Sequence, residues 1–242
     1  MTDDELYLRG AETVVASWEA IARGSRGARV IRAAGVAAAV FPNEPERTVY
    51  NNALLARGAS ADALNSMEAA YASAGVERFA AWVHESDEAM RAPLAARGYV
   101  LQETTRAMGM ELDDIRVGRP ELDLAPPDWP AYVRYLEHLG VPEGLLRYVD
   151  PGDFRLLLAH RDGELVATAL GFDRDGDRGI FNVSTLEHAR RRGLGTALTA
   201  VLVHEAAARG ASTASLQSTE IAERMYAAVG FRDLGRFLEY GR

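Results

Sequence analysis

The stretch "ARRRGLGTAL" (Ala189–Leu198) places three arginines beside two glycines, directly before an apolar run. The chain as a whole is acidic, with a formal net charge of −8 at pH 7. Apolar and β-branched residues at Ile180–Thr185 predict a strand before it, and Gly195–Arg209 predicts a helix that ends at Gly210. The stretch is therefore predicted to be a strand-to-helix loop that concentrates positive charge.

A loop of this kind is a typical binding site for an anion. The first amides of a helix have no partner within the helix, and the peptide dipoles add partial positive charge there. Gly193 and Gly195 allow the backbone to approach a ligand closely because they carry no side chain. Arginine side chains bind phosphate oxygens well. We therefore expect a phosphate-bearing ligand at this loop.

Two common phosphate-binding loops are excluded by the residues present. A P-loop requires a lysine after its glycines, and all 27 basic residues of this chain are arginine. A dinucleotide-binding fingerprint requires a third glycine three residues after Gly195, where the chain has Leu198. Another phosphate-binding pattern must account for the loop.

The spacing Arg190-x-x-Gly193-x-Gly195 resembles the pyrophosphate loop of the GNAT family of N-acetyltransferases, whose signature is [R/Q]-x-x-G-x-[G/A]. The preceding "NVSTLEHAR" resembles the end of the family's strand, although Glu187 stands where proline is usual and His188 where glutamate is usual.

The segment after the predicted helix strengthens this resemblance. "LQSTEIAERMYAAVGF" (Leu216–Phe231) is similar to the corresponding GNAT segment, and Tyr226, Gly230 and Phe231 match its pattern. The resemblance covers Phe154–Tyr240. It implies an α/β fold with a mixed sheet flanked by helices, and acetyl-CoA as the cofactor.

The resemblance also implies which residues bind acetyl-CoA. The strand end is expected to bond the pantetheine arm and to polarise the thioester through an N–H group, and the loop is expected to hold the pyrophosphate. The expected cofactor contacts are Val183, Ser184, Thr185, Arg190, Arg191, Arg192, Gly193, Leu194, Gly195, Thr196 and Thr219.

Tyr226 occupies the position of the family's general acid. A phenol of ordinary pKa, ~10, keeps its proton at neutral pH and can donate it to a thiolate. From pattern alone, a core tyrosine is the alternative. His188 and Glu187 are the candidates for the general base, since histidine titrates near neutrality. Both also fit as solvated loop residues, with the amine deprotonated through ordered water.

A proline-bearing stretch from Asp113 to Pro130 suggests a linker between two halves. We predict a first domain over 1–112, a linker over 113–127 and a second domain over 128–242. "VYNNALL" echoes "IFNVSTL", and "LAARGYV" echoes "YAAVGFR", at nearly equal separations. The first half has Leu94 where the second has Tyr226, so we predict two tandem GNAT-like domains, the first degenerate and non-catalytic.

The spacing of apolar residues, together with the glycines and prolines that interrupt it, predicts helices and strands in both halves. Helices are predicted over Asp3–Arg23, Ala61–Ser73, Asp87–Ala96, Trp129–Leu139, Pro142–Val149, Gly195–Arg209 and Ile221–Val229. Strands are predicted over Gly35–Phe41, Val49–Leu55, Arg78–Val83, Val100–Leu112, Phe154–His160, Leu165–Phe172, Ile180–Thr185, Ser212–Gln217 and Phe231–Tyr240.

The composition also indicates the compartment and excludes some classes of ligand and partner. The chain has no cysteine, which fits a reducing compartment, and no metal-ligand spacing. It shows neither a signal peptide nor an apolar run near ~18 residues, so a cytoplasmic protein without a membrane partner is expected. The negative charge disfavours nucleic acid.

The leading hypothesis is an acetyl-CoA-dependent N-acetyltransferase that acts by direct attack of a primary amine, on a small molecule or a peptide. The alternative is a non-catalytic acyl-CoA-binding regulatory module. Three roles are open for the first half, which are covering the acceptor pocket, protecting a sheet edge, or forming the interface of a homodimer.

Overall fold

The computed structural model describes the whole chain except residues 34, 47, 49 and 141–145. The described residues form two compact units, and each unit combines two separate parts of the chain. Unit 1 consists of Met1–Val14 and Ala107–Leu234, and unit 2 consists of Val15–Arg106 and Gly235–Arg242. This division differs from the contiguous one predicted at 1–112, 113–127 and 128–242, because terminal segments of each half belong to the other unit.

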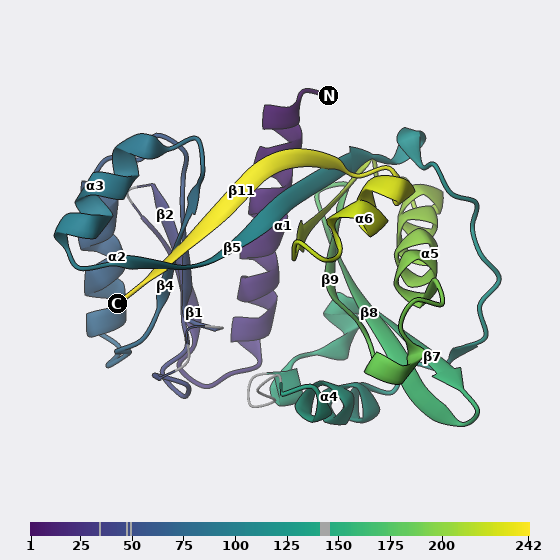
Figure 1. The fold of residues 1–242 in the computed structure, drawn as a ribbon. Helices are drawn as coiled ribbons and strands as arrows, with labels where there is room; N and C mark the ends of the chain where they lie inside the picture. The colour runs from purple at the N-terminus through teal and green to yellow at the C-terminus, as the bar shows by residue number, and fades with distance from the viewer. Residues whose placement is uncertain (34, 47, 49, 141–145) are drawn as a thin grey trace. The chain divides into compact units, whose positions relative to one another are not determined.

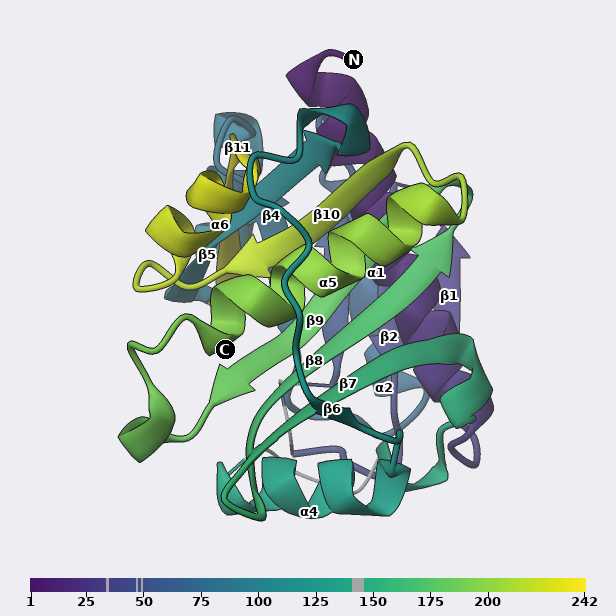
Figure 2. The ribbon, with the colours of Figure 1, turned by 90° about the vertical axis from the view of Figure 1, so that its right-hand side faces the viewer.

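Unit 1 is a mixed sheet with helices packed on it (Figures 1 and 2). Its strands follow the order β5-β10-β9-β8-β7-β6. Helix α5 packs on one face of β8 and β9 (Figure 2), and α6 packs against α5. The bounds are β5 Val100–Glu111, β6 Leu124–Ala125, β7 Phe154–Arg161, β8 Glu164–Arg174, β9 Asp177–Thr185, β10 Thr213–Ser218, α4 Trp129–His138, α5 Leu194–Ala208 and α6 Glu223–Val229, with the first part of α1 Asp3–Arg23.

In unit 2, the strands β1, β2, β3, β4 and β11 follow one another in the sheet order, with parallel and antiparallel pairs among them. Its core contains β-sheet side chains together with the apolar faces of α2 and α3. The bounds are β1 Arg29–Ala33, β2 Val36–Val40, β3 Asn52–Leu55, β4 Ala80–His84, β11 Arg232–Gly241, α2 Asp62–Ala72 and α3 Glu88–Ala96.

The two units repeat one order of elements. Strands β2 and β3 are antiparallel and β3 and β4 are parallel, just as β8 and β9 are antiparallel and β9 and β10 are parallel. The second helix of each repeat ends at a glycine with positive φ, Gly98 (φ +83°) or Gly230 (φ +133°). In each, the next N–H donates to a carbonyl five residues back, that of Leu94 at 3.1 Å and that of Tyr226 at 3.1 Å. The echoed segments of the sequence thus lie in elements that share this order and these strand directions.

The last strand of the chain completes unit 2 rather than unit 1. β11 pairs antiparallel with β4, from Phe237↔His84 to Gly241↔Ala80. Leu238 and Tyr240 are buried in the core of unit 2. The later residues of β5, among them Met108 and Met110, are instead buried in the core of unit 1. Each unit thus contains strand residues from the opposite half of the sequence.

The segment predicted as a linker, 113–127, packs against unit 1. Ile115, Val117, Leu122 and Leu124 lie partly buried against its hydrophobic core, and the segment crosses over α5 (Figure 2). His204 of α5 contacts the Val117 carbonyl through Nε2 at 2.9 Å. The prolines limit regular structure here, but the apolar residues between them still bury their side chains on the helix.

Most predicted elements are present within a few residues of their predicted bounds, and α1 has the predicted bounds. Strands β1 and β6 were not predicted. The predicted helix 142–149 lies partly outside the described residues, and its described end, Leu146–Tyr148, is a 3₁₀ turn. The predicted strand 49–55 begins at Asn52 in the structure, and position 49 lies outside the described residues.

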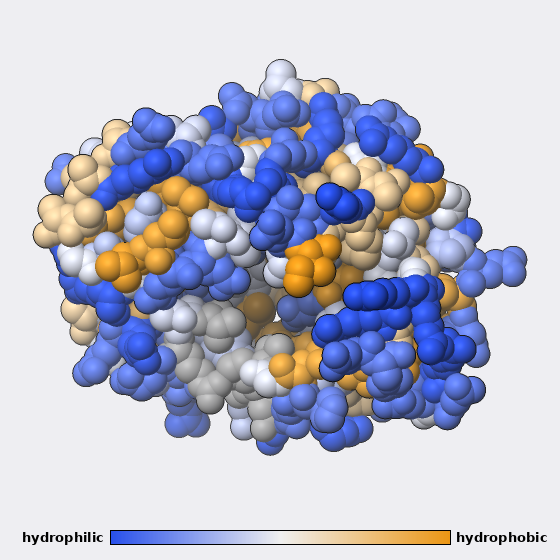
Figure 3. Space-filling model, in the orientation of Figure 1, coloured by the Kyte–Doolittle hydropathy of each residue, from blue (hydrophilic) through white to orange (hydrophobic). Residues whose placement is uncertain are grey.

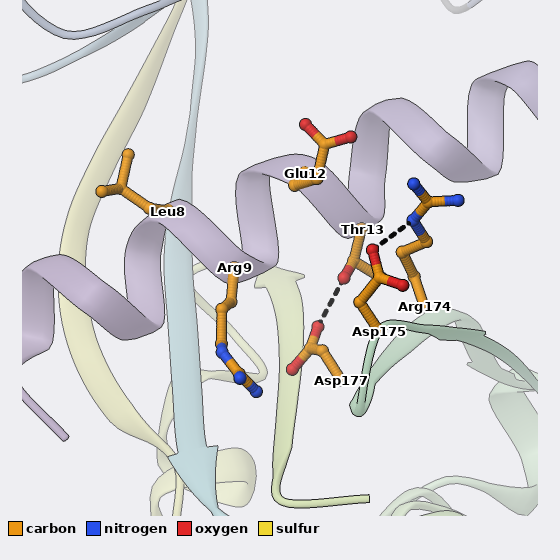
Figure 4. Close-up of a pocket in the computed structure, with 7 residues that line it drawn as sticks. All are labelled: Leu8, Arg9, Glu12, Thr13, Arg174, Asp175 and Asp177. Atoms are coloured by element: carbon orange, nitrogen blue, oxygen red, sulfur yellow. Dashed lines mark hydrogen bonds and ion pairs between the residues drawn. The ribbon is translucent and has the colours of Figure 1, made fainter.

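The start of β9 is tied to its neighbours by a buried carboxylate. Asp177 is 2% exposed and accepts hydrogen bonds from the hydroxyls of Thr13 at 2.7 Å, Thr213 at 2.7 Å and Ser215 at 2.6 Å. Figure 4 shows the bond between Thr13 and Asp177. Since a buried carboxylate is costly without donors, these three hydroxyls fix α1, β9 and β10 together.

The surface gives no sign of a large apolar patch on the face seen in Figure 3, where hydrophilic residues dominate and hydrophobic ones form small separate groups. Among the described residues, no helix has the length and hydropathy needed to cross a bilayer.

The free energy of unfolding should depend on pH because the Glu239 carboxyl on β11 is buried. Burial raises its pKa from 4.5 to about 7, the nearby Glu103 carboxylate adds to the rise, and the Thr105 hydroxyl opposes it. A raised carboxyl pKa gives a contribution to stability that is complete below about pH 4.5 and is lost as pH rises through about 7. We expect Glu239→Gln to be more stable than the wild type by about 2 kcal/mol at pH 8 and equal to it near pH 4.5.

Urea unfolding at both pH values measures this difference, with Glu103→Gln as a milder control. A Glu239→Gln variant whose stability follows the wild type at every pH contradicts the assignment.

Tyr71 of α2 provides a second stability test. Its ring stacks on Phe79 with centroids 4.1 Å apart, and its hydroxyl is buried without a partner among the described residues. Burial raises the pKa of Tyr71 well above 10. Since an unmet buried hydroxyl costs free energy, Tyr71→Phe should leave the free energy of unfolding unchanged or raise it by about 1 kcal/mol. A loss of stability in thermal or urea unfolding would show that the hydroxyl has a partner.

Candidate functional site

The site is built on a bulge in β9. Between the pairs Leu170↔Phe181 and Thr168↔Ser184, β9 advances by one residue more than β8. The extra residue lies at Asn182–Val183, and Asn182 has a φ of +49°. A bulge bends its strand and turns main-chain groups away from the regular ladder. The main-chain N–H and C=O groups of β9 therefore leave the regular ladder at Val183–Thr185, where the cofactor contacts were predicted.

Strands β9 and β10 separate just before this bulge. They pair in parallel from Thr213↔Asp177 to Leu216↔Ile180. β9 then continues to Thr185 and β10 to Ser218, but the described residues show no further pair between them. One edge of β9 from Phe181 onward thus has main-chain groups without a strand partner in the described chain, so a ligand can add to it.

Helix α5 begins at the open end of these strands. After β9 come Leu186, a 3₁₀ turn at Glu187–Ala189, and a loop that reaches the helix at Leu194. Among the described residues, none accepts from the N–H groups of Leu194, Gly195 or Thr196. The structure therefore places an unpaired helix N-terminus at the predicted pyrophosphate loop.

The three arginines of the loop differ in their surroundings. Arg190 donates from Nε to the Thr185 carbonyl at 3.1 Å, so it closes the loop onto the end of β9. Arg191 has a positive φ of +61°. Arg191 and Arg192 are exposed, and neither forms an ion pair within the described part of the chain. Their guanidinium groups are free to meet an anion.

The two glycines of the loop are required for different reasons. Gly193 has φ +77°, and a Cβ there would meet nothing within 4 Å, so the left-handed backbone conformation favours glycine and lack of space does not. A Cβ on Gly195 would lie 2.8 Å from the Met225 sulfur and 3.8 Å from Val183 Cγ1. Gly195 therefore also permits close packing of α5 on α6 and β9, a role that the motif alone does not predict.

Tyr226 on α6 lies in the core of unit 1, as the alternative interpretation predicted, but its hydroxyl remains available. It is 6% exposed and its ring meets Phe231 edge to face at 6.0 Å. The hydroxyl has no partner among the described residues. Burial raises the pKa of Tyr226 to about 12, so the group is fully protonated at neutral pH.

A network of hydroxyl groups between α4 and the bulge was not predicted. Asn182 donates from Nδ2 to the Tyr132 hydroxyl at 2.8 Å. The Ser184 hydroxyl donates to Tyr135 at 3.3 Å, and Thr168 lies 3.1 Å from Ser184. Burial raises the pKa of Tyr135. Tyr132 and Tyr135, three residues apart on α4, are the feature of the sequence that could have pointed to this network. The sequence does not show which strand they face.

The predicted base candidates lie on the surface. His188 contacts Glu164 at 3.1 Å through Nε2, and both side chains are more than half exposed. Glu187 is exposed in the same 3₁₀ turn. Thr219 is exposed after β10, and its carbonyl accepts from Ala222 at 3.0 Å and from the Ser218 hydroxyl at 2.8 Å. No described bond joins His188 or Glu187 to Tyr226.

The matching strand-to-helix loop of unit 2 is arranged differently. Gly58 has φ +72° and open space around it, like Gly193. Its N–H, however, donates to the Asp87 carboxylate at 3.1 Å, and Asp87 is 8% exposed. The pairs of β2 with β3 run from Val36↔Leu55 to Ala38↔Ala53 without a bulge. An internal carboxylate thus occupies an amide of this loop.

A cavity of about 290 Å³ lies elsewhere in unit 1, between α1 and the turn after β8 (Figure 4). Its charged side chains include Arg9, Glu12 and the ion pair Arg174–Asp175 at 2.9 Å. It contains none of the predicted site residues. No group of histidine and acidic side chains in the described chain is placed to hold a metal ion.

Comparisons with known proteins bear on the fold of the chain. The chain has the fold of a GCN5-related N-acetyltransferase from Kribbella flavida (TM-score 0.69, 19% identity, 96% of this chain and 94% of that one). It also resembles a GCN5-related N-acetyltransferase from Sphaerobacter thermophilus (TM-score 0.60, 17% identity, 96% and 85%). A third similar structure is a tandem GNAT protein from the clavulanic acid biosynthesis pathway, without acetyl-CoA (TM-score 0.57, 14% identity, 100% and 95%).

No curated protein sequence matches the chain. A sequence model of the acetyltransferase (GNAT) family matches residues 121–231, which contain β9, the arginine-glycine loop and Tyr226. The matched residues lie in unit 1, which carries the bulged strand and the open helix terminus.

Proposed function

We propose that this protein is an acetyl-CoA-dependent N-acetyltransferase that transfers an acetyl group to a primary amine of a small molecule or a peptide. The observation that carries the proposal is the separation of β9 from β10 where the unpaired amides of α5 begin. The match of residues 121–231 to the GNAT family supports it.

The residues of the site suit acetyl-CoA. The amides of Leu194, Gly195 and Thr196 offer three donors at a positive helix end, and Arg191 and Arg192 add charge for the pyrophosphate. The free edge of β9 at Val183–Thr185 offers main-chain groups for the amide-rich pantetheine arm. We place Thr219 at the end of β10, on the opposite side of the same opening.

Acetyl-CoA supplies the acetyl group as a thioester. We assign to a main-chain N–H of the bulge the polarisation of the thioester oxygen, as in an oxyanion hole. Tyr226 holds a proton for the leaving sulfur. Because its pKa of about 12 lies above that of a thiol, ~8.5, a hydrogen bond to the sulfur is the larger part of this general-acid role.

The incoming amine must lose a proton to attack. His188 and Glu187 are the side chains that we propose for this role, either directly or through water. Their exposure suits a water-mediated path, since neither is held in the described structure against the Tyr226 hydroxyl.

We also propose that unit 2 is a degenerate GNAT-like domain without acetyl-CoA chemistry. The repeated order of strands supports the common architecture, and the contact of Gly58 with Asp87 supports the loss of binding. A structural neighbour described as a tandem GNAT protein covers the whole of this chain.

Two measurements test the proposal together. Calorimetry with CoA tests binding, and release of free thiol from acetyl-CoA across a panel of amines tests transfer. Binding with thiol release supports the enzyme, binding without release for any amine supports the regulatory module, and no binding overturns both.

Replacement of the Tyr226 hydroxyl should separate chemistry from binding. We expect Tyr226→Phe to lower kcat about 100-fold, within the range for loss of a general acid, and to leave the Kd for CoA within twofold. Steady-state kinetics and calorimetry measure the two quantities, and Tyr71→Phe is the matched control in unit 2. An unchanged kcat would show that Tyr226 is a packing residue.

One chain should bind one equivalent of CoA. Unit 1 offers open amides, whereas Asp87 occupies an amide of the corresponding loop in unit 2. Calorimetry or native mass spectrometry gives the stoichiometry. Two equivalents per chain would contradict the assignment of unit 2 as degenerate.

A further inference from the structure

We propose that Tyr132 of α4 is a positioning residue that holds the β9 bulge in its working conformation by binding the side chain of Asn182. The inference rests on the proposed function, because it concerns the main-chain group that faces the thioester. It adds to that function a contact between a helix and the bulge.

The bulge needs such a contact because its backbone is strained. Asn182 has a φ of +49°, a left-handed region that is unfavourable for an L-residue and that asparagine tolerates better than most. A residue in this region keeps its conformation only where neighbouring groups hold it. The structure shows what holds Asn182.

Asn182 is bound at both its side chain and its carbonyl. Its Nδ2 donates to the Tyr132 hydroxyl at 2.8 Å, and its carbonyl accepts from the Thr168 hydroxyl at 3.3 Å. Thr168 is 0% exposed on β8 and also lies 3.1 Å from the Ser184 hydroxyl. Asn182 and Ser184, on the two sides of Val183, therefore both contact Thr168. Tyr132 holds the side chain of Asn182.

Tyr132 itself is held firmly. It is 0% exposed, and its ring meets Trp129 with centroids 5.2 Å apart. Trp129 Nε1 donates to the Leu146 carbonyl at 2.7 Å. The Asp128 side chain caps α4 by accepting from the Ala131 N–H at 2.9 Å. The Tyr132 oxygen thus has a fixed position from which to hold Asn182.

The consequence falls on the next residue, Val183. Since Asn182 determines the backbone direction at the bulge, its conformation sets where the Val183 N–H points. Val183 also lies under α5, where its Cγ1 would be 3.8 Å from a Cβ on Gly195. Loss of the Tyr132 contact should therefore loosen the thioester end of the site and leave the pyrophosphate end intact.

Two variants remove the contact from opposite sides. Tyr132→Phe removes only the oxygen that accepts the bond. Asn182→Gly removes the amide but keeps a residue that adopts positive φ freely. Tyr71→Phe, a buried tyrosine of unit 2, is the matched control. For each variant we would measure kcat, the Kd for CoA, the Kd for acetyl-CoA and the melting temperature.

We expect each variant to lower kcat at least fivefold and to weaken acetyl-CoA about threefold or more, while the Kd for CoA stays within twofold, because CoA has no thioester oxygen. The double variant should be no worse than either single one. A purely structural role would change the Kd values for CoA and acetyl-CoA equally, together with the melting temperature.

If Tyr132→Phe does not fold, Asn182→Gly decides the question alone. Unchanged kcat and an unchanged ratio of the two Kd values in either folded variant overturn the positioning role and leave the proposed function standing. No CoA binding by the wild type overturns the function itself.

Discussion

Strand β9 pairs with β10 over the first part of its length and has no pair with β10 over the second part in the described chain. The candidate site depends on this difference. At the start of β9, the Asp177 carboxylate accepts hydrogen bonds from hydroxyls of α1 and β10. Beyond Ile180 the paired positions end, and a bulge at Asn182 turns the backbone. Because the strand stays attached to β8 throughout, the opening is confined to one edge, and α5 begins where that edge is free.

The loop could be predicted from the sequence because its chemistry is local. Three arginines and two glycines between a strand and a helix already define an unpaired helix terminus with positive charge. The hydroxyl network could not be predicted in the same way, because Tyr132 and Asn182 lie 50 positions apart in the chain. Their contact depends on how α4 packs on the sheet, which no local pattern of residues records.

Asparagine shows how similar sequence patterns acquire different roles. Asn51 is fully buried, accepts from the Phe41 N–H at 2.8 Å and donates to the Glu44 carbonyl at 2.8 Å, so it is a structural residue. Asn182, at the equivalent place in the echo, is exposed and sits in a bulge. The order of strands and helices was largely predictable, because it follows from periodicity. The division into units was not, since the pairing of β11 with β4 joins residues far apart in sequence.

The position of β11 along the chain has a consequence for synthesis in the cell. Leu238 and Tyr240 of the unit 2 core are made long after Arg106, where the first part of this unit ends. The whole of the second part of unit 1, Ala107–Leu234, is translated in between, and during that time one side of β4 has no partner from β11. A nascent chain that stalls before β11 is made would expose this edge to chaperones and proteases.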